Sequence, residues 1–290
     1  EMTSSLVGSE MCIRDRYKVV LDLDGTPLRI EKRIRGAAEM MIEDAMIAAN
    51  EAVARFLEKT GNTSVYRVHD HPDEEKLNAL KRLVSIMGLP IHIPEDPTPK
   101  DIQKLLESVE GEDIEPVVQV MTLRSLPQAC YKTENAGHFG IASKCYTHFT
   151  SPIRRYPDLM VHRLIRQALS EQLKKNQLKA QTDFLVRACD HCSETEQNAT
   201  QTERDVDDLK MTEYMIPFVG EPFDAHITGI TRFGIFVGLD NGVEGLIHID
   251  TMEDDEYVYQ EDSMTLKGRF SGKTYSMGMP VRVCLLYTSP

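Results

Sequence analysis

The chain has 290 residues, carries a formal net charge of −13 at pH 7 and is 41% hydrophobic. This length and composition suffice for one large or two smaller domains with a buried core. The acidic balance argues against a protein that binds polyanions without specificity, although a local basic groove stays possible. Six cysteines in a chain of this length do not form a disulfide framework and indicate reduced thiols.

Both ends of the chain break the pattern of their neighbours. Residues 5–16 read SLVGSEMCIRDR and residues 284–290 read CLLYTSP. Because both stretches resemble translated adapter sequence, we expect residues 1–16 and 284–290 to be non-native and the natural protein to extend beyond them. The sequence shows neither an apolar run of membrane-spanning length nor a secretory leader, so we expect a cytoplasmic location without membrane contact.

The stretch YKVVLDLDGTPLRI, Tyr17–Ile30, is the first that suggests chemistry. An apolar strand that runs into Asp-Leu-Asp-Gly-Thr resembles the loop of haloacid-dehalogenase-type phosphatases, with Asp22 as nucleophile, Asp24 as general acid and Mg²⁺ between them. The alternative is a hairpin whose turn is made by Gly25 and Pro27. We favour the hairpin, because successive helices follow instead of the parallel alternation of strands and helices that the phosphatase fold requires.

The residues after this stretch have helical periodicity. Residues 37–62 place apolar residues at spacings of three and four, which predicts one helix with a core-facing side. That side consists of Met41, Ile42, Ala45, Met46, Ala49, Val53, Phe56 and Leu57. Further helices are expected at residues 74–87, from Pro97 or Thr98 to Gly111, and at residues 114–131, 159–176 and 184–215.

After Gly220 the pattern changes to short alternating strands separated by glycine turns, typical of a small antiparallel barrel. A domain boundary is therefore expected between Ile216 and Gly220. The fold class predicted from the whole chain is α+β, with a mainly helical domain at residues 17–217 and a small antiparallel β-barrel (OB fold) at residues 218–283. The last strand of that barrel is expected to be missing, because the suspect tail follows MPVRV.

The densest group of polar and aromatic residues is HFTSPIRRYPDLMVHR, His148–Arg163. Arg154 and Arg155 project from a rigid Ser-Pro turn, and Pro157 is placed where a helix can start. Two guanidinium groups beside Tyr156 suit a phosphate and a stacked base. A surface loop whose arginines pair with nearby carboxylates explains the same residues.

This stretch resembles the signature of the RNB-domain exoribonucleases, the family of ribonuclease II and ribonuclease R. Other matching stretches occur in the order and spacing of the family: residues 41–54 (MIEDAMIAANEAVA), 66–73 (YRVHDHPD), 97–101 (PTPKD), 123–131 (LRSLPQACY), 137–142 (GHFGIA) and 202–209 (TERDVDDL). The strands after Gly220 resemble the S-one-type RNA-binding barrel that follows the RNB domain. The resemblance covers about Tyr17 to Val283.

The resemblance implies hydrolysis of single-stranded RNA from the 3′ end to nucleoside 5′-monophosphates by a monomeric, Mg²⁺-dependent enzyme. The metal-binding aspartates of the family form a cluster upstream of the helix at Met41, and no such cluster precedes Met41 here. We therefore expect the ligands of Mg²⁺ to belong to a missing upstream segment, and this chain alone to be inactive. The alternative is a non-catalytic RNA-binding module with a degenerate RNB domain.

Within the part that is present, the resemblance makes Arg154 and Glu203 the catalytic candidates. Arg154 would contact the scissile phosphate, and Glu203 would help to hold the last nucleotides. Arg155 and Tyr156 are weaker candidates for RNA binding that also shape the loop. We interpret His162 as a packed or hydrogen-bonded structural histidine.

In the barrel, the resemblance assigns RNA binding to Arg232, Phe233, Phe236 and His248. Strand alternation alone leaves it open whether either phenylalanine points inward.

Three further motifs have simpler explanations. His69 and Asp70 could line the RNA channel or belong to a capped loop. The CDHC stretch at Cys189–Cys192 has the spacing of a zinc knuckle but no second pair nearby, so structural thiols are the better interpretation and no metal site is predicted in this chain. The acidic residues 253–262 are interpreted as an exposed loop of the barrel.

Overall fold

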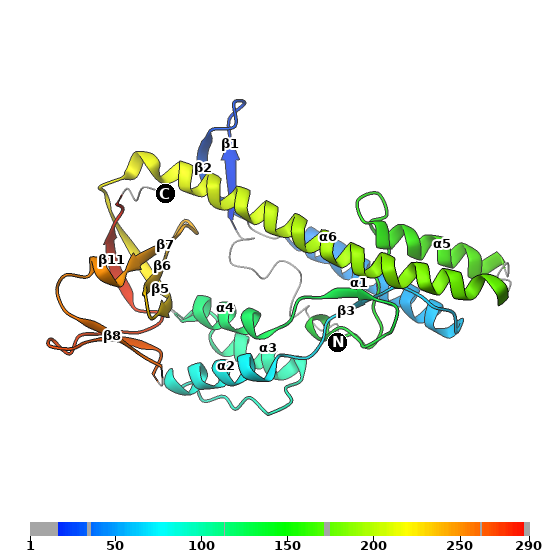
Figure 1. Cartoon of the computed structure of the whole chain (residues 1–290), viewed down its shortest axis with the longest axis horizontal. Helices are drawn as coiled ribbons and strands as arrows, with labels where there is room; N and C mark the ends of the chain where they lie inside the picture. Colours follow the sequence, from blue (N-terminus) through cyan, green and yellow to red (C-terminus); the bar gives the residue numbers. More distant parts are fainter. Residues whose placement is uncertain (1–16, 34–35, 113, 171–174, 262, 287–290) are drawn as a thin grey trace. The chain divides into compact units, whose positions relative to one another are not determined.

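The computed structural model describes residues 17–33, 36–112, 114–170, 175–261 and 263–286, which form two compact units (Figure 1). Of these residues, the first unit takes 36–73 and 126–204, and the second takes 17–33, 74–125 and 205–286. The predicted non-native leader and residues 287–290 of the predicted tail lie outside the described residues. No helix among the described residues is long and apolar enough to cross a membrane.

The first unit is built on three helices and one short strand pair. Its helices are α1 (Ala37–Lys59), α5 (Tyr156–Ser170) and the part of α6 (Lys175–Met215) up to Arg204. Strands β3 (Tyr66–Val68) and β4 (Cys130–Lys132) pair antiparallel. Apolar side chains from all three helices meet in one core, which contains Leu57, Val65, Tyr131, Met160, Val161, Leu164, Leu185 and Cys189.

Helix α1 was predicted correctly as a helix, but most of its predicted core face is wrong. The side chains of Met41, Ile42, Met46 and Phe56 are exposed, with Met41 reaching 67%. Only the second half of α1 is buried, where it packs against α5. Periodicity identifies which residues share a face, but it does not show whether another element covers that face.

The second unit begins with the hairpin of β1 (Tyr17–Leu21) and β2 (Pro27–Lys32). The carboxylate of Asp22 accepts hydrogen bonds from the main-chain nitrogens of Asp24 and Thr26, at 2.9 and 2.8 Å. Gly25 lies in the left-handed region with φ +83°. Asp22 is therefore a turn-forming residue in a two-stranded antiparallel sheet, as the hairpin interpretation predicted.

Helices α2 (Glu74–Ile86), α3 (Pro99–Ser108) and α4 (Glu115–Ser125) lie in the second unit, which also contains the end of α6 from Asp205. Their core contains Leu77, Leu80, Val84, Ile93, Leu105, Val109 and Val118. The prediction that the last of these helices continues to Tyr131 is wrong. Pro127 disfavours helix at the residue before it, and residues 130–132 pair as β4 instead.

The C-terminal strands of the second unit form two antiparallel sheets. Their bounds are β5 (Pro222–Thr231), β6 (Gly234–Leu239), β7 (Glu244–His248), β8 (Tyr257–Gln260), β9 (Thr265–Gly268), β10 (Thr274–Tyr275) and β11 (Pro280–Cys284). The orders are β11-β5-β6-β7 and β10-β9-β8. A shared core joins the sheets, with Ile227, Ile235, Val237, Tyr257 and Leu266 among its buried members.

The strands confirm an antiparallel C-terminal region, although the two sheets do not close into a barrel within the described residues. Residues 253–262 are not wholly a loop, because Tyr257–Gln260 is strand β8 and Tyr257 is buried. The strand is the short run Tyr-Val-Tyr-Gln, and the acidic residues that flank it hid its strand character in the sequence.

Candidate functional site

The candidate catalytic arginine stands on a tight turn just before α5. The main-chain nitrogens of Arg154 and Arg155 both donate to the carbonyl oxygen of Ser151, at 3.3 and 3.1 Å. The main-chain N–H of Ser151 in turn donates a hydrogen bond to a carboxylate oxygen of Asp158, at 2.7 Å. Asp158 is fully buried in the first turn of α5, so the turn is fixed from inside the unit.

The two adjacent arginines have different surroundings. Arg155 donates from Nη2 to Asp158 at 2.9 Å, and its side chain is only 19% exposed. Arg154 is exposed, and its guanidinium has no hydrogen bond or ion pair within the described part of the chain. Arg155 is thus a structural cation that is paired with Asp158, whereas Arg154 has no partner within the described residues. Arg154 can receive a phosphate, whereas Arg155 contributes to the turn that carries Arg154.

A layer of aromatic and imidazole rings lies inside the same unit. A hydrogen bond of 2.8 Å joins the Tyr131 hydroxyl to Nδ1 of His148, and the guanidinium of Arg67 sits 4.6 Å from the centre of the Tyr131 ring. Arg67 also forms an ion pair with Glu196 of α6. The sequence did not single out Arg67 or Glu196, because their 129-residue separation gives no local signal.

His69 and His138 continue this layer, with ring centres 5.1 Å apart. Burial lowers the pKa of His138 to about 3, and the neighbouring His69 and Arg67 act in the same direction. Burial also lowers the pKa of His69 and brings the pKa of His148 well below its usual range. All three imidazoles are therefore neutral at neutral pH and serve as packed, uncharged parts of the interior.

The buried position of His69 favours a structural role for it over RNA contact. Asp70 is exposed and accepts a hydrogen bond from Nζ of Lys132 at 3.1 Å. His162 is structural as predicted, since its ring stacks on Phe149 at 4.2 Å between ring centres. Cys189 is also structural: it lies in the core of the first unit, and burial raises the pKa of its thiol to about 12.

Glu203 and Tyr156, the other two candidates in the first unit, are both exposed. Glu203 lies on α6, and Tyr156 is the first residue of α5. Within the described residues, no hydrogen bond or ion pair joins Glu203 to Arg154. Both remain accessible to a ligand, and their roles stay predictions.

A second surface bears three of the four candidates of the C-terminal strands. The pairing of β6 with β7 places Phe236 opposite Leu246 and Gly234 opposite His248, so Phe236, Leu246 and His248 share one face. The neighbours of Phe236 on β6, Ile235 and Val237, are buried on the opposite face. Phe236 therefore lies on the outer face of its sheet.

Phe233 extends this face at the turn before β6. It is exposed, and its ring meets that of Phe236 edge-on at 5.9 Å between centres. The side chain of Arg232 is 79% exposed and lies 3.3 Å from a carboxylate oxygen of Glu261. An ion pair this exposed contributes little to stability, so the guanidinium can exchange Glu261 for a phosphate.

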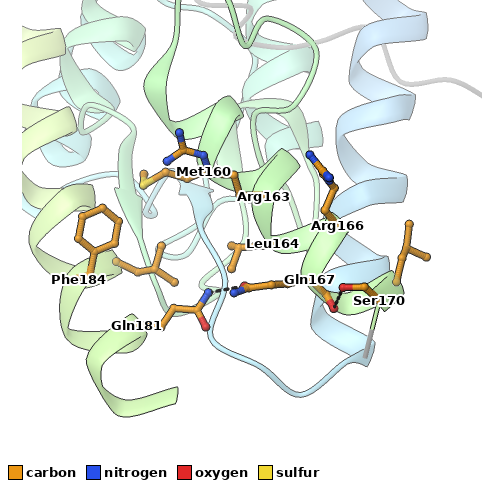
Figure 2. A pocket seen from close by; sticks show the side chains of 10 residues that line it. Met160, Arg163, Leu164, Arg166, Gln167, Ser170, Gln181 and Phe184 are labelled. Carbon is orange, nitrogen blue, oxygen red and sulfur yellow. Dashed lines mark hydrogen bonds between the residues drawn. The ribbon is translucent and has the colours of Figure 1, made fainter. Parts of the chain in front are cut away.

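A concave region of about 620 Å³ lies between α5 and the start of α6 (Figure 2). Its floor includes the buried side chains of Met160, Leu164 and Leu185. Gln181 of α6 donates to Gln167 of α5 at 2.6 Å, which ties the two helices together across it. Both amides are thus engaged with each other, and the polar side chains of Arg163, Arg166 and Ser170 also line the region.

Within the described residues, no group of three or more histidine, cysteine, aspartate or glutamate side chains is arranged to hold a metal ion. The described residues therefore do not fit a Mg²⁺ site, and no chemical step is assigned to a metal here.

Comparison with known proteins decides the family. The RNB domain model matches residues 8–171, more than half of the chain, and the S1 RNA binding domain model matches residues 216–288. The chain belongs to the RNB-domain family.

Curated relatives and a solved structure agree with this assignment. Ribonuclease R 1 of Lactococcus lactis is 40% identical over 92% of this chain, and ribonuclease R of Escherichia coli K12 is 38% identical over 93%. The chain spans only 33% and 34% of the lengths of these two relatives. The structure of Mycoplasma genitalium RNase R with ribose-methylated single-stranded RNA has a TM-score of 0.88 and 33% identity, covering 94% of this chain and 43% of that one.

The fold does not by itself decide activity. Yeast Ssd1, described as a pseudonuclease, shares the fold with a TM-score of 0.67 at 19% identity, over 80% of this chain and 29% of its own. Function in this RNB-domain chain must therefore be argued from its side chains.

Proposed function

We propose that the whole protein is a 3′-to-5′ exoribonuclease that hydrolyses single-stranded RNA to nucleoside 5′-monophosphates. The observation that carries this proposal is the exposed guanidinium of Arg154, which has no partner among the described residues and stands on a turn that Asp158 fixes from inside. A preorganised cation of this kind stabilises the negative charge that develops on a phosphate during hydrolysis. Membership of the RNB-domain family, with ribonuclease R among the relatives, supports the choice of RNA.

In this proposal, RNA enters with its 3′ end toward Arg154, and Glu203 helps to hold the last nucleotides. Arg155 does not contact RNA directly but holds the turn through Asp158. The face formed by Phe233, Phe236 and His248 stacks bases of the RNA, because aromatic rings bind bases of any sequence. The reaction depends on Mg²⁺, and its products leave one nucleotide at a time.

The test is a gel assay of the full-length protein with single-stranded RNA labelled at the 5′ end, with and without Mg²⁺. Stepwise shortening from the 3′ end only with Mg²⁺, and release of labelled mononucleotide only at the last step, supports the proposal. Arg154→Ala should lower turnover far more than it weakens binding. RNA that is bound but stays full length under all conditions would instead identify a non-catalytic RNA-binding module.

The same assay on this chain alone separates binding from chemistry. We expect retarded, full-length RNA, because the described residues do not supply a metal site. Shortening that requires Mg²⁺ would show that carboxylates of this chain complete such a site.

A further inference from the structure

A single buried amide on α1 holds the segment that leads to Arg154. Asn50 is 3% exposed and uses both ends of its side chain. Its Nδ2 donates to the hydroxyl of Tyr146 at 2.9 Å, and its Oδ1 accepts from the main-chain nitrogen of Phe149 at 3.0 Å. Asparagine is a weaker helix former than alanine, so Asn50 costs helix stability in the middle of α1. Its two side-chain hydrogen bonds offset this cost.

The peptide groups around Phe149 are held from both sides. While Asn50 accepts from the nitrogen of Phe149, Nε2 of His162 lies 3.0 Å from the carbonyl oxygen of the same residue. The His162 ring also stacks on the Phe149 ring, with an interplanar angle of 16°. Main-chain movement at Phe149 would therefore break contacts to two different helices, α1 and α5.

Further contacts hold the main chain between Phe149 and the candidate catalytic residue. Two residues after Phe149, the nitrogen of Ser151 is fixed by Asp158, and the carbonyl of Ser151 accepts from the nitrogen of Arg154. Two of these links, those from Asn50 and Asp158, join a buried side chain to the main chain of the same short segment. Arg154 itself is left exposed at the end of this series.

We propose that Asn50 is a positioning residue of the candidate active site, acting on Arg154 through the main chain at Phe149. This inference rests on the proposed function. Its physical basis is that stabilisation of a transition state requires placement to within a fraction of an ångström, and that loss of a supporting contact allows larger movements.

The experiment is a double-mutant cycle on the full-length protein with 5′-labelled single-stranded RNA, in which kcat and KM are measured separately. Asn50→Leu keeps the size of the side chain and removes both hydrogen bonds. We expect it to lower kcat by about 100-fold with little change in KM. In the Arg154→Ala background, the same substitution should lower kcat no further, because the residue it positions is absent.

Two further variants control for folding. Thr63→Val removes a hydrogen bond of 2.8 Å to Thr182 in the same unit and should lower the melting temperature without changing kcat. His162→Phe keeps the stacked ring but removes the contact to the carbonyl of Phe149, so it should lower kcat in the same way as Asn50→Leu. It tests the proposal independently if Asn50→Leu does not fold.

The outcomes separate this inference from the function on which it rests. Wild-type turnover in Arg154→Ala would overturn the proposed role of Arg154 and, with it, the positioning role of Asn50. A large defect in Arg154→Ala, combined with unchanged kcat in both Asn50→Leu and His162→Phe, would overturn the positioning role alone. The positioning role would also be overturned if Asn50→Leu lowered kcat by the same factor in the wild-type and in the Arg154→Ala backgrounds.

Discussion

Asp158 in the first turn of α5 accepts a hydrogen bond from the main-chain nitrogen of Ser151, at 2.7 Å. The same carboxylate oxygen also accepts from Arg155 at 2.9 Å. One buried anion thus binds both the turn and the guanidinium of Arg155, whereas the guanidinium of the preceding residue, Arg154, has no partner among the described residues and can face a ligand.

Removal of this anion should destabilise the first unit strongly. Asp158→Ala leaves the mostly buried Arg155 without its counter-ion, and we expect the free energy of unfolding to fall by about 3–5 kcal/mol in urea denaturation. The matched control is Asp70→Ala, which breaks an exposed pair with Lys132 and should cost less than about 1 kcal/mol. Equal losses in the two variants would contradict the role given to Asp158.

The buried imidazoles predict that acid weakens the first unit. The folded-state pKa of His138 is about 3, below its ordinary value of 6.5, so between these values the unfolded state binds more protons than the folded state. The contribution of the uncharged His138 ring to the free energy of unfolding is therefore complete above about pH 6.5 and is lost as the pH falls toward 3.

His138→Phe keeps an aromatic ring at this position and removes the titration. We expect the slope of unfolding free energy against pH, measured by denaturant titration between pH 5 and 6, to fall by about 1 kcal/mol per pH unit. Tyr146→Phe, which removes a hydrogen bond to Asn50 but no group that titrates in acid, should lower stability without changing that slope. An unchanged slope in His138→Phe would show that its proton uptake does not govern acid stability.

Local chemistry in the sequence was sufficient to predict several elements. Asp22 and Gly25 carry the turn of the first hairpin. Thr98 and Asp101 carry the N-terminus of α3, where the Asp101 carboxylate accepts from both the nitrogen and the hydroxyl of Thr98. In such cases the hydrogen-bond partners are only a few residues apart, so a local sequence pattern is enough to indicate the contact.

The sequence did not predict what depends on distant partners. Strands β3 and β4 are three residues each and exist only because they pair with one another. Arg154 and Arg155 are adjacent residues of the same type, and only the structure shows that Asp158 pairs with Arg155. Asn50 gave a weak signal as a polar residue within an apolar helical pattern, but its partners lie 96 and 99 residues away.

The outer face of β6 and β7 predicts a measurable loss of RNA affinity. Because base stacking on an aromatic ring contributes about 1–3 kcal/mol, Phe236→Ala should weaken binding of a labelled single-stranded oligonucleotide by about 5- to 150-fold in fluorescence anisotropy. Phe270→Ala removes a more exposed ring, 84% accessible, from the connection between β9 and β10, on the other sheet. Similar losses from both variants would mean that this face has no special role.

Close approach of two strands beside this face makes Gly234 sensitive to substitution. A Cβ atom at Gly234 would lie 2.2 Å from the carbonyl oxygen of Ile247 on β7, and main-chain atoms cannot rotate away as a side chain can. We expect Gly234→Ala to lower the free energy of unfolding by about 3 kcal/mol and to displace His248, its partner in the register. The matched control is Gly245→Ala, whose Cβ would lie 3.9 Å from a methyl group of Val237, an ordinary contact that should cost less than about 1 kcal/mol. Thermal unfolding of both variants decides the point, since equal melting temperatures would show that β6 and β7 can separate at little cost.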